Sequence, residues 1–394
     1  MIPSVTKFVA SATAPFTRVL PCPVIRSILD RLRRRVSAIQ RTVLTLSLLI
    51  PSSVLSAAYP TPVEGDFIAR DFRFESGEVL PELRLHYTTI GTPVRNPSGV
   101  VTNAILVLHG TGGSARGFLS ENFGGVLFGE NQLLDGNRHY IILPDSIGHG
   151  RSGKPSDDLR MGFPRYSYQD MVRAQHLLLT EGLGVNHLRL VMGTSMGGMH
   201  TWVWGVSYPD FMDALCPLAS LPAPIAGRNR MLRRMIMDSI RSDPEWKQGN
   251  YDKPPEKGLK AAMYGLLVMV SSPLQWHRQA PTREAADALF DQMVQSRMAS
   301  TDANDMLYQF DSSRDYDPSP GLERIQAPLL AINSADDEVN PPELGILEAQ
   351  IGRVQRGMAI VIPTSERTRG HGTHSLPALW KDELERLLRE SEDY

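Results

Sequence analysis

The sequence predicts an α/β protein with a mainly parallel central sheet, flanked by helices and carrying a helical lid insertion. Short apolar runs recur along the chain, and stretches with helical spacing lie between them. The runs show no period-two alternation, which is typical of strands covered on both faces. Residues 223–318 lack such runs and carry scattered Met and Pro with helix-like spacing. This segment therefore predicts a helical insertion over the end of the sheet.

The predicted elements begin with an antiparallel pair at a sheet edge, because Asp71–Phe74 and Leu83–Thr89 alternate with period two. Five further strands are expected at Ala104–Leu108, Tyr140–Leu143, Leu188–Met192, Leu329–Ile332 and Met358–Ile362. Helices are expected at Tyr168–Glu181, Met196–Tyr208 and Leu376–Arg389. The resulting organisation is an N-terminal extension with a signal peptide (1–58), a first core part (59–222), the lid (223–318) and a second core part (319–394).

Charge and composition exclude several classes of protein. The chain has 394 residues, with 41 Lys and Arg against 43 Asp and Glu, but residues 1–58 carry a net charge of +7. The remainder therefore carries about −9, whereas nucleic-acid binding needs a basic surface. With only two cysteines, Cys22 and Cys216, the usual Cys-rich zinc site and a disulfide framework are excluded. We expect no metal and no cofactor.

The N-terminal extension has the layout of a secretory signal peptide. A basic stretch that starts at Arg31 is followed by the apolar stretch Val43–Leu55 and by small residues that end at Ala58. The apolar stretch has roughly 13 residues, whereas a membrane-spanning helix needs about 20. We therefore expect cleavage near Ala58 and a periplasmic or secreted protein with no stable membrane span; a disordered basic tail is the alternative.

The clearest catalytic signal is the G-x-S-x-G motif Gly193-Thr194-Ser195-Met196-Gly197, which lies between a predicted strand and a predicted helix. A serine on such a tight turn needs glycine two residues before and after it, because larger side chains would collide. The helix N-terminus presents N–H groups to a developing oxyanion. Ser195 is thus the candidate nucleophile of a nucleophile elbow formed with Gly193 and Gly197.

A serine needs a histidine base and an acid that orients the histidine. In α/β-hydrolases, the acid and then the histidine follow later strands. Asp336 and Asp337 both follow one predicted strand, and His371 and His374 both follow the next. Asp337 is favoured because it precedes Pro341 by four residues, a spacing common in this fold, and Asp336 is interpreted as a solvated neighbour. His371 is favoured because it is nearer its strand, whereas His374 is expected to open the last helix.

A Gly-rich turn, His109-Gly110-Thr111-Gly112-Gly113, follows the strand Ala104–Leu108. Its backbone can supply one oxyanion N–H from Thr111, and Met196 can supply the other. A phosphate loop is excluded because Ser114 and Ala115 stand where its Gly and Lys would be. His109 is interpreted as a structural histidine hydrogen-bonded beside the loop.

Residues 100–394 resemble the homoserine O-acetyltransferase branch of the α/β-hydrolase superfamily. The resemblance rests on Asp170–Gln175, Ser195–Met199, Ser242–Trp246, Gly249–Tyr251, Asp302–Asn304 and Asn340–Pro342. It implies a triad of Ser195, Asp337 and His371, a helical lid, and a homodimer built through lid helices. It also implies an acyl-serine that is formed from acetyl-CoA and passed to an amino-acid hydroxyl.

Two departures from that family point to hydrolysis. Met263 takes the place of a lid arginine, and Gly372 replaces an acid after the catalytic histidine. Both family residues grip the charged groups of the amino acid, and each lost charge-assisted bond costs about 1.5–3 kcal/mol. The sequence therefore predicts a serine hydrolase of small or medium esters. The alternatives are acyl transfer to homoserine or another alcohol, and a binding protein without turnover.

Overall fold

One sheet of eight strands forms the centre of residues 59–392, which are the residues that the computed structural model describes. The predicted signal peptide and Cys22 lie outside them. The strands are β1 (Val63–Arg73), β2 (Val79–Ile90), β3 (Ala104–Leu108), β4 (Tyr140–Pro144), β5 (Leu190–Thr194), β6 (Leu215–Leu218), β7 (Leu329–Ser334) and β8 (Gly357–Ile362). Their order is β1-β2-β4-β3-β5-β6-β7-β8.

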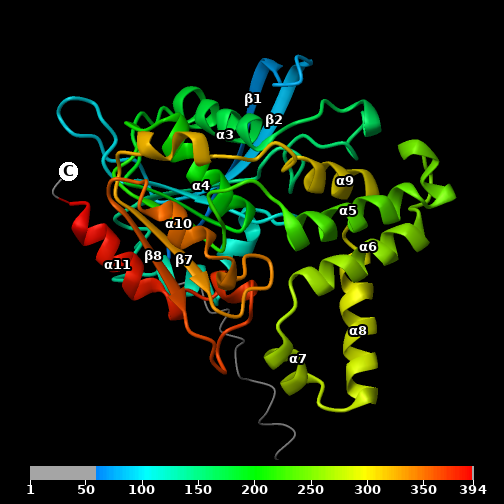
Figure 1. Ribbon diagram of the computed structural model, residues 1–394. Coiled ribbons are helices and arrows are strands. Elements are labelled where there is room, and N and C mark those ends of the chain that lie inside the picture. Colours follow the sequence, from blue (N-terminus) through cyan, green and yellow to red (C-terminus); the bar gives the residue numbers. More distant parts are fainter. Residues whose placement is uncertain (1–58, 393–394) are drawn as a thin grey trace, which may run out of the picture. The chain divides into compact units, whose positions relative to one another are not determined.

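Most of the sheet is parallel. β2 pairs with β1 and with β4 in antiparallel fashion, and every other pairing in the sheet is parallel (Figure 1). The register of the edge pair runs from Val63 opposite Thr89 to Arg73 opposite Val79. The predicted fold class is therefore confirmed. An antiparallel edge pair is also present, but its first strand begins at Val63, before the predicted Asp71, and Leu83–Thr89 lies opposite Val63–Ala69.

β6 has no counterpart among the predicted strands. It has only four residues and includes Pro217, and proline is rare in a central strand because it has no N–H to donate. The strand nevertheless lies between β5 and β7, with Pro217 opposite Gly193. It lies beside β5, the strand that leads into the turn at Ser195.

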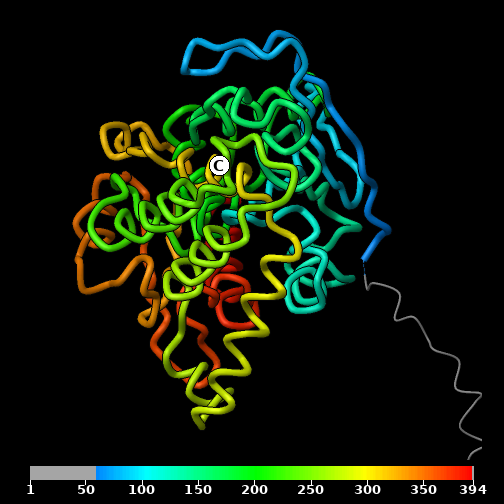
Figure 2. The backbone as a smooth tube through the Cα atoms, turned by 90° about the vertical axis from the view of Figure 1, so that its right-hand side faces the viewer, coloured from blue at the N-terminus to red at the C-terminus, as the bar shows by residue number. Residues whose placement is uncertain are grey.

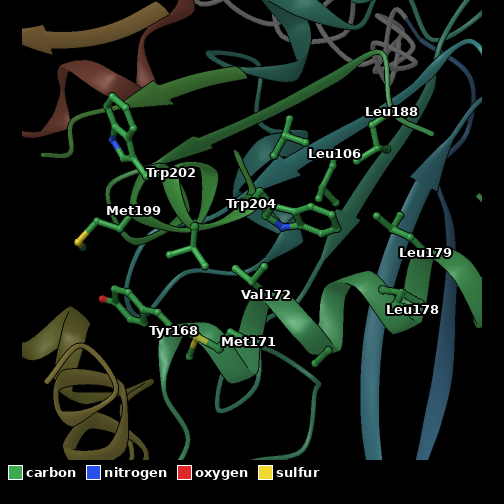
Figure 3. Packing of buried hydrophobic residues seen from close by; sticks show 14 of the residues in the cluster. Leu106, Tyr168, Met171, Val172, Leu178, Leu179, Leu188, Met199, Trp202 and Trp204 are labelled. Atoms are coloured by element: carbon green, nitrogen blue, oxygen red, sulfur yellow. The ribbon is translucent and has the colours of Figure 1, made fainter. Parts of the chain in front are cut away.

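Helices cover both faces of the sheet. Leu106 and Leu108 of β3 belong to one buried cluster with residues of α3 and α4, whereas Ile105 and Val107 belong to another with residues of α2 and α11. Because successive side chains of a strand point to opposite faces, the two clusters lie on opposite sides of the sheet. The helices are α2 (Gly124–Leu127), α3 (Tyr168–Leu177), α4 (Met196–Ser207), α10 (Ile346–Ile351) and α11 (Lys381–Glu390). Figure 3 shows Trp202 and Trp204 of α4 within the first cluster, with Tyr168 and Val172 of α3 nearby.

Short helical turns complete the core. A π-turn, Leu178–Gly182, continues α3, and the 3₁₀ turns are Ala115–Leu119, Arg160–Gly162, Pro244–Gly249, Ser319–Arg324, Pro342–Leu344, Gly372–Ser375 and Pro377–Leu379. The last helix was expected from Leu376 but begins at Lys381. Leu376 precedes Pro377, which disfavours helical geometry at Leu376 (φ −118°, ψ 76°). The prediction that His374 opens this helix is thus wrong, because His374 lies in the 3₁₀ turn before it.

Five helices follow one another between β6 and β7. They are α5 (Gly227–Arg241), α6 (Glu256–Met269), α7 (Pro273–Gln279), α8 (Arg283–Met298) and α9 (Ala303–Asp311). They have a buried cluster of their own, which includes Ile236, Met263 and Leu307. In Figures 1 and 2 this lid extends to one side of the sheet, and α7 and one end of α8 form its lower end. Within residues 59–392, no helix has the length and apolar character needed to cross a membrane.

Candidate active site

Ser195 occupies the sharp turn between the end of β5 and the start of α4. Its backbone has φ 55° and ψ −111°, a strained conformation that costs about 1–3 kcal/mol. The turn is fixed from two sides, because the N–H of Ser195 donates to Leu218 O (2.9 Å) and its carbonyl accepts from Met199 N (2.9 Å). The strain presents the hydroxyl beyond the carboxyl end of β5.

The two elbow glycines are required by close backbone contacts. A methyl group on Gly193 would collide with the backbone of Gly197, and one on Gly197 would collide with the carbonyl oxygen of Leu108 on β3. These contacts are with main-chain atoms, which cannot turn aside as a flexible side chain can. The spacing of G-x-S-x-G thus follows from the closeness of β3, β5 and α4.

The structure brings Ser195, His371 and Asp337 together from three separate loops. Nε2 of His371 lies 2.8 Å from Ser195 Oγ, and Nδ1 lies 3.0 and 2.9 Å from the two carboxylate oxygens of Asp337. The His371 and Asp337 side chains are buried, and Ser195 is partly exposed. These are hydrogen-bond distances for a nucleophile, a base and the group that orients the base.

The surroundings of Asp337 assign the proton positions. Its Oδ1 accepts from the backbone N–H groups of Val339 (2.8 Å) and Asn340 (3.2 Å), and its Oδ2 accepts from Asn340 Nδ2 (3.2 Å). Burial raises the pKa of Asp337, but the charge and hydrogen bond of His371 and these donors outweigh burial, so the pKa is lowered. An ionised Asp337 requires Nδ1 of His371 to donate, which leaves Nε2 free to accept the serine proton.

The second aspartate has a different role from the one predicted. Asp336 was interpreted as a solvated neighbour, but its Oδ2 accepts from Thr368 Oγ1 and from Gly370 N, both at 2.9 Å. Its other oxygen accepts from Ser334 Oγ at 2.5 Å. Asp336 therefore connects the loop after β7 that carries Asp337 (the acid loop) to the loop that carries His371. A charged side chain beside the favoured acid was the only sequence signal for this role.

The second histidine packs against the first. The His374 ring meets the His371 ring edge to face, with centroids 5.2 Å apart. Burial, reinforced by the nearby His371, lowers the pKa of His374 to about 3. At neutral pH the His374 ring is therefore uncharged. It packs against His371 and makes no hydrogen bond to Ser195.

The Gly-rich loop after β3 runs next to the serine. A methyl group on Gly110 would lie 3.3 Å from Ser195 Cβ, so the loop passes close to Ser195. His109 holds it in place, since Nδ1 donates to Gly110 O (2.9 Å) and Nε2 accepts from Ser146 N (3.0 Å), as predicted for a structural histidine. Among the described residues, no hydrogen-bond acceptor is found for the N–H of Thr111. This N–H is available to a ligand near Ser195.

The lid is joined to the core mainly through α9. Tyr308 OH donates to Phe163 O (2.5 Å) and to Met161 O (3.1 Å), and Gln309 Nε2 donates to Gly148 O (2.8 Å). Lid methionines lie largely in the lid's own core, since Met237, Met263 and Met269 are buried there, while Met231 and Met235 are exposed.

A cavity of about 530 Å³ adjoins the acid loop. Its lining is mostly apolar and includes Met199, Leu221 and Val339 together with Asp337. Neither Ser195 nor His371 is among the described residues that line it. Within residues 59–392, no group of three or more His, Cys, Asp or Glu side chains is placed to hold a metal ion.

The sheet order, the strand–turn–helix serine and the loops after β7 and β8 define an α/β-hydrolase. Residues 103–357 match the family model described as alpha/beta hydrolase fold. A homoserine O-acetyltransferase of Pelobacter propionicus is 33% identical over 312 residues, covering 70% of this chain and 82% of that protein. A probable acyltransferase of Methanothermobacter thermautotrophicus is 31% identical over 306 residues, covering 76% and 88%.

A solved structure has the same fold. The acetylester hydrolase from Corynebacterium glutamicum superposes with a TM-score of 0.71 at 22% identity, covering 83% of this chain and 96% of that one. The chain belongs to the α/β-hydrolase family, in the branch that resembles homoserine O-acetyltransferases. This family membership supports a hydrolase or acyltransferase activity.

Proposed function

We propose that the protein is a serine hydrolase that cleaves a small or medium ester through an acyl group on Ser195. The observation that carries the proposal is the continuous path of hydrogen bonds from Ser195 through His371 to Asp337. The three side chains meet at the carboxyl ends of parallel strands, where α/β folds place their ligands.

The chemistry follows from the proton positions. Nε2 of His371 accepts the hydroxyl proton as Ser195 Oγ attacks the ester carbonyl, and Asp337 stabilises the imidazolium that forms. The imidazolium then gives the proton to the departing alcohol, which leaves an acyl-serine. A water molecule attacks this acyl group with the same base, and the carboxylic acid leaves as Ser195 regains its proton.

The oxyanion is stabilised by backbone donors. The N–H of Met196 is at the start of α4, and the N–H of Thr111 is available in the loop beside Ser195. Each such donor supplies roughly 3 kcal/mol of transition-state stabilisation. Both are main-chain groups and are fixed before the substrate arrives.

Water is proposed as the acyl acceptor because the two positions at which homoserine O-acetyltransferases are expected to bind the amino acid carry no charge in this chain. Met263 is fully buried in the apolar lid core, and Gly372 has no side chain to pair with an ammonium group. Without charged partners at these two positions, a zwitterion taken from water would lose charge-assisted hydrogen bonds. A neutral ester has no such cost.

Acyl transfer to homoserine or another alcohol is the second candidate, and the similarity to homoserine O-acetyltransferases favours it. Initial rates with p-nitrophenyl acetate, and with acetyl-CoA plus homoserine, separate the two. We expect ester hydrolysis to be much faster, and a homoserine rate well above the ester rate would overturn the preference. A binding protein without turnover would fail to react with a fluorophosphonate.

We also propose that the protein is exported and that it forms a homodimer. An exported, mature chain should begin near Tyr59, and N-terminal sequencing of secreted protein tests this; intact residues 1–58 in the cytoplasm would contradict it.

A homodimer through the lid is supported by exposed apolar side chains on α5 and α6, namely Met231, Met235, Tyr264 and Val268. Light scattering should give a dimer mass that Met235→Glu reduces to that of a monomer.

A further inference from the structure

Side chains of the lid donate hydrogen bonds to the loop that carries His371. The side-chain amide of Gln275, on α7, donates through Nε2 to Glu366 O (2.7 Å) and to Thr368 O (2.9 Å). Arg278, one turn further along α7, donates to Glu366 O (2.9 Å). Gln275 therefore bonds to two carbonyls of this short loop, and it is the lid donor to the carbonyl of Thr368, three residues before His371.

The same loop is held from the core on its other side. Asp336 accepts from Thr368 Oγ1 and from Gly370 N, as described above. Gly370 (φ 56°) lies where the two supports meet, because a methyl group there would lie 2.8 Å from Ser271 O of the lid and 3.0 Å from Asp336 O. The loop is thus sandwiched between the lid and the acid loop, and the space admits only glycine.

Of the two segments that hold this loop, lid helix α7 is less firmly fixed than the acid loop. None of the residues of α7 is buried, whereas α9 contributes seven buried residues, including Met306 and Leu307. Segments with few buried apolar contacts open most readily. The helix that holds the histidine loop is therefore the part of the lid best able to move.

We propose that Gln275 is a positioning residue for His371, through which the position of lid helix α7 sets the alignment of the imidazole. The proposal rests on the proposed function, in which His371 is the base. Loss of the two Gln275 hydrogen bonds leaves Arg278 as the donor from α7 to the loop, so the loop loosens near Thr368 and His371 drifts from Ser195 and Asp337. A displacement of about 1 Å can lower the rate by about 100-fold.

The main variant is Gln275→Leu, which keeps the side-chain size and removes both donors. We expect kcat for p-nitrophenyl acetate to fall by about 10- to 100-fold with KM unchanged, because alignment for chemistry is lost and substrate binding is kept. Gln275→Lys retains a donor and should recover most of the rate. Gln279→Leu is the matched control, since Gln279 lies exposed on the same helix.

The melting temperature separates positioning from a loss of folding. Asp337 and His374 are the titratable groups that face His371. When the loop loosens, kcat should fall while the melting temperature of Gln275→Leu stays close to that of the wild type. A purely structural loss would lower the melting temperature together with kcat.

A second readout needs no turnover. In a Ser195→Ala background, NMR of the nitrogen-15-labelled His371 ring should show faster exchange of the Nδ1 proton when Gln275 is Leu, because the bond to Asp337 is less firmly held. An unchanged His371 signal in Gln275→Leu overturns the proposal, and so does an equal change in Gln279→Leu. If the wild type hydrolyses no ester, the proposed function fails, and the NMR comparison alone decides on the positioning role.

Discussion

Replacing Asp337 by Asn tests the proton assignment of the site. Oδ1 accepts from the backbone N–H groups of Val339 and Asn340, so an amide NH₂ cannot occupy that position without facing two donors. The NH₂ is therefore directed to the Oδ2 position, which lies 2.9 Å from His371 Nδ1. There it favours the tautomer with no proton on Nδ1, and Nε2 then carries the proton and cannot accept one from Ser195.

The expected loss is large. A wrong tautomer lowers kcat by about 10⁴-fold, or about 5 kcal/mol of transition-state stabilisation. At the Oδ2 position the new NH₂ faces the side-chain Nδ2 of Asn340, which is also a donor. Asn340 cannot rotate freely to remove this contact between two donors, because its Nδ2 also donates to Ala219 O at 2.9 Å. The assay is the initial rate with p-nitrophenyl acetate for folded protein, with Glu338→Gln as control, since Glu338 forms an ion pair with Arg228 near the surface. A loss of less than about 10-fold in Asp337→Asn would refute the reasoning.

Three further predictions concern stability. Gly197→Ala should lower the free energy of unfolding by about 3 kcal/mol or more in urea, because its methyl group collides with Leu108 O; an unchanged midpoint would count against the elbow geometry. Because the pKa of His374 is about 3 when folded and near 6.5 when unfolded, the unfolded state binds more protons between these values. Stability is therefore lost as pH falls through this window, by up to ~1.4 kcal/mol per unit, and His374→Phe should flatten the dependence between pH ~7 and ~4.5; an identical slope would contradict the burial of this ring. Tyr308→Phe removes the hydroxyl that joins α9 to Phe163 O, and should cost about 1 kcal/mol and speed proteolysis of the lid; wild-type cleavage rates would argue against this anchor.

Local patterns were sufficient for the parts of the fold that depend on local physics. β3 was predicted residue for residue, because a short run buried on both faces is apolar throughout. The helix after Ser195 was predicted because a glycine-flanked serine needs a strand before it and a helix after it. β6 was missed because its identity as a strand comes from neighbours on both sides, against the local preference of Pro217.

The candidate site, like the fold, could be predicted from the sequence only in part. The spacing of Asp337 to Pro341 was enough to select it over Asp336, and the closeness of His371 to its strand end was enough to select it over His374, as the pair that meets Ser195. The supports of that pair were not predictable, because they depend on loops that approach one another only in the folded chain. Gln275 carried no sequence signal, since a glutamine in a polar helix has no pattern that reveals the two carbonyls it reaches.

The most direct test of the account is mass spectrometry of protein quenched during the first turnover of p-nitrophenyl acetate. We predict one acetyl group on the peptide that contains Ser195, formed slowly in His371→Ala and lost to water at the steady-state rate. Steady turnover with no acetyl group on Ser195, or with the acetyl group on another residue, would contradict the account.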